Sequence, residues 1–218
     1  MPKRFDLLVF DWDGTLIDSA GAIAACIQAA CRDLGLPVPD EARARHVIGL
    51  GLADSLAHAI PGLAPSEYPR VAERYGVHFR ARDADLPLFP GTREMLESLR
   101  ASGHRLAIAT GKSRAGLARA LAHTGLARHF DATRCADQSA SKPAPDMLLE
   151  LLDELALEPA HALMIGDTSH DLQMAANAGV AAVAVSYGAH DAAALARHAP
   201  LGLVHSTAEL GRWLSANA

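Results

Sequence analysis

Short apolar runs, each next to a longer helical pattern, recur along this chain. Four of them are FDLLVF (5–10), RLAIAT (105–110), ALMIG (162–166) and VAAVAV (180–185). An apolar run of this length is typical of a strand that is buried on both faces, as in a parallel sheet. Strands that alternate with helices of ten or more residues form βαβ units. The sequence therefore predicts an α/β fold with a doubly wound parallel sheet.

Residues 18–87 interrupt this alternation. The apolar residues from Ile23 to Leu34 recur at helical spacing, and the stretch 66–81 has the same period. No apolar run between them resembles a strand. We expect a small all-helical cap domain at 18–87, inserted after the first strand into an α/β core domain formed by 1–17 and 88–218. Such an insertion can serve as a lid over a site on the core.

The composition is that of a soluble globular protein. Half of the 218 residues are apolar, the formal net charge is −5, and the 17 arginines are spread without a basic run. Nucleic acids and anionic membranes attract basic patches, so the sequence predicts neither partner. The N-terminal apolar run is too short for a signal peptide or a membrane span. Cys26, Cys31 and Cys135 have no metal-type spacing and are odd in number, which favours buried thiols in a reducing, cytoplasmic location.

Two aspartates directly follow the first predicted strand. In VFDWDGT (9–15) one residue separates Asp11 from Asp13, so both side chains can point to one spot beyond the carboxyl end of the strand. Open α/β sheets bind their ligands at that edge. Gly14 and Thr15 then permit a tight turn that brings backbone N–H groups close to a bound group. The residues alone also leave open an ordinary Asp-Gly turn, with Asp11 as a helix cap.

A second acidic pair follows another predicted strand. ALMIGDTSHD (162–171) places Asp167 at the strand end and Asp171 four residues later, where a helix should begin. Like charges about 4 Å apart repel by roughly 4 kcal/mol at an effective dielectric of about 20, so carboxylates gathered at one sheet edge need a cation. Oxygen ligands without Cys or His favour Mg²⁺. The alternative is Asp167 as an N-cap and Asp171 as a first-turn acid.

Groups suited to a phosphoryl ligand are expected at the same edge. Thr110 and Gly111 end the run RLAIAT, and Lys142 lies in a loop before the next predicted helix. A hydroxyl, free N–H groups and an ammonium can hold and neutralise a phosphoryl group. The alternative for Lys142 is a solvated surface lysine, although the chain contains only three lysines.

Three residues beside these motifs are not expected to take part. ATGKS (109–113) is similar to the end of a nucleotide-binding P-loop, but the glycine required five residues before Gly111 is Leu106. Lys112 is therefore expected to be an exposed residue near the mouth of the site. Trp12 should point to the opposite face from its neighbouring acids and pack there. His170 is expected to be an exposed first-turn residue.

Four segments, in their order and spacing, resemble the motifs of the haloacid dehalogenase superfamily: DWDGT (11–15), Thr-Gly (110–111), Lys-Pro (142–143) and GDTSHD (166–171). The resemblance covers nearly the whole chain. The opening VFDWDGTLIDS, with a helical insertion after it, is most similar to the phosphoglycolate phosphatase-like branch. This resemblance implies a Mg²⁺-dependent phosphatase that hydrolyses a small phosphorylated metabolite through an aspartyl-phosphate intermediate.

The resemblance also implies a role for each motif residue. Asp11 would be the nucleophile, and Asp13 the acid that protonates the leaving oxygen and later activates water. Mg²⁺ would be held by Asp11, the backbone carbonyl of Asp13 and Asp167, with Asp171 supporting these ligands. The phosphoryl oxygens would be held by Thr110, Gly111 and Lys142.

Other chemistries of the superfamily agree less well with the residues. A dehalogenase motif resembles this one without the second aspartate, and a phosphonatase of this branch would need a lysine in the cap, whereas residues 16–87 contain none. The missing lysine also weakens a sugar-phosphate mutase, for which His46 and His58 are the candidates in the cap, although both are expected on the surface. A mutase, a pyrophosphatase and a non-catalytic module that binds a phosphorylated ligand remain the alternatives.

Specificity is expected to come from the cap. In the loop HVIGLGLADSL (46–56), Gly49 and Gly51 could close backbone N–H groups over a small acid, and Arg45 could bind its carboxylate. The alternative is a turn between two helices with a solvated arginine. Several small phosphomonoesters, and both a monomer and a homodimer, are compatible with the sequence.

Overall fold

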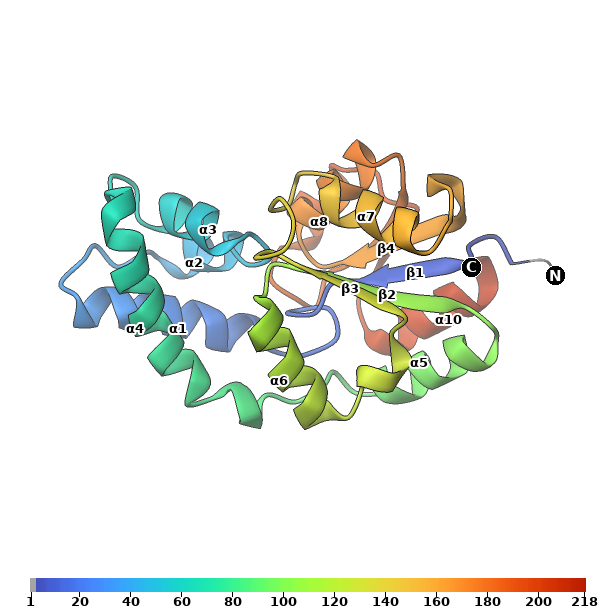
Figure 1. The fold of residues 1–218 in the computed structure, drawn as a ribbon, viewed down its shortest axis with the longest axis horizontal. Coiled ribbons are helices and arrows are strands. Elements are labelled where there is room, and N and C mark those ends of the chain that lie inside the picture. The colour runs from blue at the N-terminus through green and yellow to red at the C-terminus, as the bar shows by residue number, and fades with distance from the viewer. Residues whose placement is uncertain (1–2) are drawn as a thin grey trace.

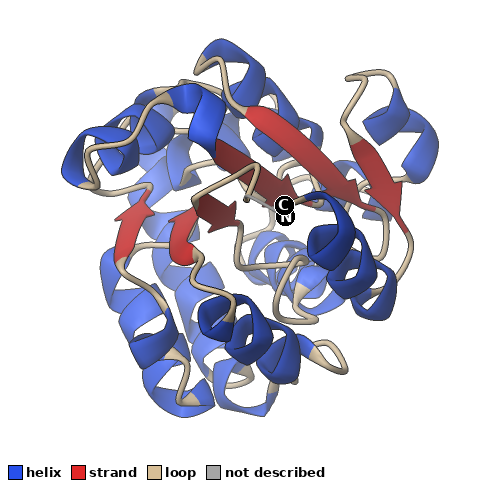
Figure 2. Cartoon of the chain, turned by 90° about the vertical axis from the view of Figure 1, so that its right-hand side faces the viewer, coloured by secondary structure: helices blue, strands red, loops and turns tan. Residues whose placement is uncertain are grey.

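A six-stranded parallel sheet forms the centre of the protein. The computed structural model describes residues 3–218. The strand order is β3-β2-β1-β4-β5-β6, and every neighbouring pair is parallel. The strands are β1 (Leu7–Phe10), β2 (Arg105–Thr110), β3 (Ala132–Cys135), β4 (Ala162–Gly166), β5 (Ala181–Val185) and β6 (Gly202–Val204). Helices lie on both sides of the sheet (Figure 2), which confirms the predicted α/β, doubly wound fold.

The helices form two layers on the sheet and one group beyond its end. The group comprises α1 (Ala20–Asp33), α2 (Glu41–His46), α3 (Leu52–Ala59) and α4 (Tyr68–Arg80). The remaining α-helices are α5 (Thr92–Ala101), α6 (Arg114–Thr124), α7 (Asp146–Glu154), α8 (Ser169–Asn177), α9 (Ala192–Ala196) and α10 (Thr207–Asn217). Short 3₁₀ helices occupy Pro65–Glu67, Asp83–Asp85, Ala127–His129 and Pro159–His161. None of the helices in residues 3–218 is long and apolar enough to cross a membrane.

Successive strand residues pack into two different apolar clusters, as the pleat requires. Leu8 and Phe10 of β1 belong to the cluster under α5, α6 and α10, whereas Leu7 and Val9 belong to the cluster under α7 and α8. Figure 1 shows these two groups of helices on opposite sides of the sheet. Trp12 is fully buried in the first cluster, so the prediction that it packs is confirmed. The sheet is therefore covered on both faces, and its functional groups are left to the strand ends.

The predicted strands are found, but two edge strands were not predicted. β2 and β4 span the ranges expected from their apolar runs, and β1 and β5 start one or two residues later than expected. β3 is half-buried in its centre and β6 has three residues, so neither has a continuous apolar run. The alanine-rich stretch 189–199 contains only the short helix α9, because Asp191 caps it and Ala199, before a proline, has a positive φ.

Residues 18–87 contain helices and turns but no strand, and they gather at the end of the sheet that Figure 1 shows on the left. Their apolar side chains form a cluster of their own, which includes Ile23 and Val71. The two connections to the sheet run side by side: Ile17 pairs with Leu88, and the Asp18 N–H donates to the Pro87 carbonyl at 2.9 Å. The division into a core domain (1–17 and 88–218) and a cap domain (18–87) stays a prediction.

Candidate active site

The two aspartates of the first motif lie where the sheet changes direction. β1 has β2 on one side and β4 on the other, so the chain winds outwards both ways from this strand, and such a switch point is where open α/β sheets bind ligands. The Asp11 N–H continues the ladder by donating to the Ile165 carbonyl at 2.9 Å. Asp11 and Asp13 are both buried. The predicted position of the acidic pair at a strand end thus agrees with the structure.

Lys142 is the cation of this site. Its side chain is fully buried in the loop after β3, and Nζ donates to Asp11 Oδ1 at 2.9 Å and to Asp171 Oδ1 at 2.6 Å. The alternative of a solvated surface lysine is therefore wrong. Burial disfavours the ammonium, but the charges of Asp11 and Asp171 outweigh it and raise the pKa of Lys142 above its usual value. The ammonium stays charged and links the carboxylate that follows β1 to the carboxylate in the first turn of α8.

Asp11 has one oxygen without a partner. Its Oδ1 accepts from Lys142, whereas Oδ2 is a buried side-chain oxygen that has no hydrogen-bond partner within residues 3–218. Burial raises the pKa of Asp11 to about 7, with Lys142 opposing this shift and Asp171 adding to it. A buried, unsatisfied carboxylate oxygen costs free energy, and native structures retain such an atom where a ligand or an ion completes it.

The second motif brings two more carboxylates to the same place. Asp167 accepts from Thr15 Oγ1 at 2.8 Å and from the Ala189 N–H at 2.7 Å. It is not the N-cap, because Thr168 caps α8 and forms a capping box with Asp171, which is the predicted first-turn acid. Burial, then the charges of Asp11 and Asp171, raise the pKa of Asp167 well above its usual value. Oxygens of the three aspartates lie within 4.8 Å of one another.

Gly14 allows this close approach. Its φ of 84° is in the left-handed region, and a Cβ at this position would collide with Oδ2 of Asp167. The turn after Asp13 can therefore fold directly against the second motif. The predicted role of Gly14 in a tight turn agrees with this geometry.

Thr110 and Gly111 end β2 beside these carboxylates. Thr110 is buried, and its Oγ1 accepts from the Lys112 N–H at 3.1 Å. A Cβ on Gly111 would overlap the backbone carbonyl of Gly49, so a glycine is needed where the β2 loop meets the helical segment. The structure thus brings the residues of all four motifs to one edge of the sheet.

Comparison with known proteins places the chain in a family. The family model described as "Haloacid dehalogenase-like hydrolase" matches residues 8–185. The chain belongs to this family. It is 36% identical over 211 residues to the "Probable phosphatase IndB" of Dickeya dadantii, with 94% of this chain and 91% of that protein aligned. It is 31% identical over 199 residues to a phosphoglycolate phosphatase of Haemophilus influenzae, with 86% and 88% aligned.

The solved structures agree with this assignment. A haloacid dehalogenase-like family hydrolase from Streptococcus pneumoniae superposes with a TM-score of 0.82 at 26% identity, covering 96% of this chain and 98% of that one. The predicted resemblance to the haloacid dehalogenase superfamily, and to its phosphoglycolate phosphatase-like branch, is confirmed.

Lys112 differs from its prediction in this haloacid dehalogenase-like hydrolase. It was expected to be exposed, but only 9% of its side chain is accessible, and Nζ lies 3.2 Å from both carboxylate oxygens of Asp13. Nζ also lies 4.5 Å from the ring centroid of Phe79 on α4. Ser19 donates a further hydrogen bond to Asp13 at 2.9 Å. The sequence feature that indicates this position is the place of Lys112 directly after Thr-Gly at a strand end.

His170 also differs from its prediction. It is buried rather than exposed, because His170 Nε2 and His190 Nε2 donate to the same carbonyl oxygen of His46, at 2.7 and 3.1 Å. The His190 ring stacks on that of His46, which is itself exposed as expected. Burial lowers the pKa of His170 to about 4, so the imidazole is neutral near pH 7. The three histidines join the end of α2 to α8 and to the loop before α9, and they are not among the grouped aspartates.

Of the predicted cap residues, one lines the site. Gly49 lies on the cavity that contains Asp11. Arg45 is not among the residues that line it, because α2 brings its guanidinium to Glu41, one turn earlier, at 2.8 Å. The Gly51 N–H donates to Ser141 Oγ at 2.6 Å and is not free for a substrate. His58 is exposed, as expected.

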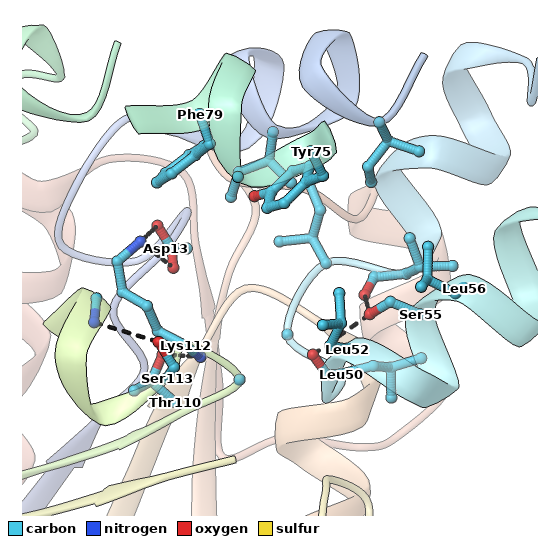
Figure 3. A pocket seen from close by; sticks show the side chains of 18 of the residues that line it. Asp13, Leu50, Leu52, Ser55, Leu56, Tyr75, Phe79, Thr110, Lys112 and Ser113 are labelled. Atoms are coloured by element: carbon cyan, nitrogen blue, oxygen red, sulfur yellow. Dashed lines mark hydrogen bonds and ion pairs between the residues drawn. The ribbon is translucent and has the colours of Figure 1, made fainter. Parts of the chain in front are cut away.

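A cavity of about 290 Å³ lies between the aspartates and the helical segment. Asp11, Asp13, Thr110 and Lys112 line its floor, and the other walls include side chains of α1, α3 and α4, the loop 47–50 and the start of α6. Figure 3 shows Tyr75 and Phe79 on the α4 side, with Asp13 and Lys112 below them. The size suits one small ligand.

Proposed function

We propose that the protein is a Mg²⁺-dependent phosphatase that hydrolyses a small phosphomonoester through an aspartyl-phosphate on Asp11. The observation that carries this proposal is the unpartnered Oδ2 of Asp11, which is buried at the end of β1 while Lys142 holds the other oxygen. A carboxylate is suited to nucleophilic attack when one of its oxygens is held by a hydrogen bond and the other oxygen is free at a cavity.

The residues present are compatible with a magnesium ion. Three buried aspartates offer oxygens within 4.8 Å of one another, and a hard oxygen donor set is the one that Mg²⁺ prefers. Asp11, Asp167 and the backbone carbonyl of Asp13 would hold the ion, and Asp171, fixed by Lys142 and Thr168, would support them. When bound, the ion offsets the repulsion between these carboxylates and a phosphate dianion.

The side chains suggest two matched steps. Asp11 Oδ2 would attack phosphorus, the ester P–O bond would break, and Asp13 would give its proton to the departing oxygen. Asp13 would then take a proton from water, whose oxygen attacks phosphorus and breaks the acyl-phosphate bond. This second step regenerates the free Asp11 carboxylate and releases phosphate. Thr110, the Gly111 N–H and Lys142 would hold the phosphoryl oxygens during both steps.

Asp13 first needs a proton, although Lys112 and Ser19 now bind its carboxylate. An incoming phosphate dianion attracts the Lys112 ammonium as well, and this competition would free Asp13 for protonation. Lys112 would then neutralise part of the phosphate charge. This adds a fourth cationic or polar group to those expected from the motifs.

The substrate is proposed to be a small phosphorylated metabolite, and relatives named as phosphoglycolate phosphatases make 2-phosphoglycolate the first compound to test. A sugar-phosphate mutase, a pyrophosphatase and a non-catalytic phospholigand-binding module are the alternatives. The free cysteines of the chain, all buried, favour a cytoplasmic location.

The test is release of inorganic phosphate from a panel of small phosphomonoesters and pyrophosphate, with Mg²⁺ and then with excess chelator. We expect release that stops with chelator and is absent in Asp11→Asn, whose circular dichroism should match the wild type. Release that survives the chelator would contradict the metal requirement. Release by Asp11→Asn at the wild-type rate would remove Asp11 as the nucleophile.

A further inference from the structure

The wall of the cavity above the aspartates is apolar. Ile23 and Ile27 of α1, Leu56 of α3 and Val71 of α4 line it together with the rings of Tyr75 and Phe79. Figure 3 shows Leu56, Tyr75 and Phe79 of this group around one space, with Asp13 below the two rings. A group joined to a phosphate bound at Asp11 would therefore border an apolar chamber that these side chains form.

Few polar side chains belong to this wall, and one of them, Ser55, is already bonded to the backbone. Ser55 Oγ donates to the carbonyl oxygens of Val47 and Leu50, at 3.0 and 3.4 Å. Burial, together with the charge of Asp13, raises the pKa of the Tyr75 hydroxyl, which is therefore a neutral phenol. A sugar or a nucleoside, which carries many hydroxyl and amide groups, would leave most of them unpaired here.

Within the described residues, this chamber also lacks a close, unpaired cation for a carboxylate. Arg45 binds Glu41 and does not line the cavity, and Lys112 is already paired with Asp13 and packed on Phe79. Arg80 and Arg119 line the cavity but are exposed to solvent, so they lie where it opens. A buried carboxylate would lose its hydration without gaining a close ion pair.

The aromatic side of the chamber suits a ring. Tyr75 and Phe79 stack with their centroids 5.6 Å apart and their planes 16° from parallel. Aromatic pairs favour a further ring in an offset or edge-on contact. A cavity of about 290 Å³ exceeds the roughly 150 Å³ in which an apolar protein cavity holds benzene, so one ring and a phosphoryl group have room.

We propose that the phosphomonoester substrate carries an uncharged apolar group, of the size of one aromatic ring or a branched alkyl chain, which the side chains of α1, α3 and α4 enclose while its phosphate lies at Asp11. This inference rests on the proposed phosphatase function and narrows its substrate class. It assigns specificity to the apolar wall, with Ile27, Val71 and Tyr75 as its specificity-determining residues.

The first test compares three esters with alkyl leaving groups in the presence of Mg²⁺: 2-phenylethyl phosphate, ethyl phosphate and 2-phosphoglycolate. All three release an alkoxide-type oxygen, so differences report on binding of the organic group. Burial of one ring should raise kcat/KM for 2-phenylethyl phosphate about tenfold to hundredfold over both others. A kcat/KM for 2-phosphoglycolate that equals or exceeds that of 2-phenylethyl phosphate would overturn the inference.

A matched pair of variants on α4 tests the wall itself. Val71 is buried and lines the cavity, whereas Val77 is 44% exposed on the same helix and does not line it. Val71→Ala should lower the ratio of kcat/KM for 2-phenylethyl phosphate to that for ethyl phosphate by about threefold, and Val77→Ala should keep the wild-type ratio. An unchanged ratio in both variants would contradict the assigned wall.

Binding of phosphonates, which cannot be hydrolysed at the P–C bond in this way, separates the two proposals. Calorimetry with Mg²⁺ compares 3-phenylpropylphosphonate with 3-phosphonopropionate. If no ester is hydrolysed, the phosphatase proposal fails, and the apolar inference is judged by binding alone. Binding of the phenyl compound about tenfold or more tighter would support it, and equal or weaker binding would overturn it.

Discussion

Replacing Lys142 with methionine should destabilise the protein strongly, because it removes the buried cation between two buried carboxylates. Nζ lies 2.9 Å from Asp11 Oδ1 and 2.6 Å from Asp171 Oδ1. At an effective dielectric of about 20 each contact corresponds to roughly 6 kcal/mol of attraction, most of which offsets the cost of burying the charges. Removing one partner of a buried pair typically costs about 3–5 kcal/mol, and we expect a loss in this range for Lys142→Met.

The assay is urea-induced unfolding followed by circular dichroism at pH 7, with chelator and then with Mg²⁺. A divalent cation would restore part of the lost unfolding free energy, because it neutralises the same carboxylates. Lys3→Met is the matched control: Lys3 is exposed and donates to the Gly103 carbonyl, so a change of about 0.5 kcal/mol or less is expected. If Lys142→Met lost no more unfolding free energy than Lys3→Met, the buried ammonium would not be balancing these charges.

Two further predictions concern residues that differ from their sequence-based expectations. Lys112→Met removes the cation beside Asp13, and we expect kcat/KM for ethyl phosphate to fall by about tenfold. A kcat/KM equal to that of the wild type would show that Lys112 takes no part in the reaction. His170 has a depressed pKa, so its contribution to stability is complete above about pH 6.5 and is lost as pH falls towards 4, by up to roughly 3 kcal/mol. His170→Gln should flatten this acid-side loss in urea titrations, and an unchanged slope would contradict the shift.

The fold was largely predictable because its central strands are buried on both faces. β1, β2, β4 and β5 have apolar runs for this reason, and their order along the chain already implied parallel pairing. The edge strands β3 and β6 were not predictable in the same way. An edge strand has only one neighbour and partly exposed positions, so its residues carry no continuous apolar signal.

The positions of the motif residues followed from strand ends, whereas their partners did not. That Asp11 and Asp167 would meet could be inferred, because both follow strands of one sheet. Lys142 could be identified as a candidate, but its buried position could not be predicted, since a loop lysine is usually solvated. Lys112 and Asp13 follow neighbouring strands, so their pairing could have been inferred, whereas the contact of Lys112 with Phe79 depends on how α4 packs over the sheet.

The helical segment 18–87 was the least predictable part. Arg45 was a candidate for binding a carboxylate ligand, with a solvated arginine as the alternative, and a glutamate one helical turn earlier binds it. The apolar wall is formed by residues of three helices that are far apart in sequence, and each is typical of an ordinary helix core. Only their common position around the cavity distinguishes them from such a core.

The central claim is that Asp11 carries the phosphoryl group, and the most direct measurement is the site of phosphate label in enzyme quenched with acid during turnover. We predict label on the peptide that contains Asp11 in the wild type, and none in Asp11→Asn. Phosphate release without label on this peptide, or label on another residue, would contradict the account.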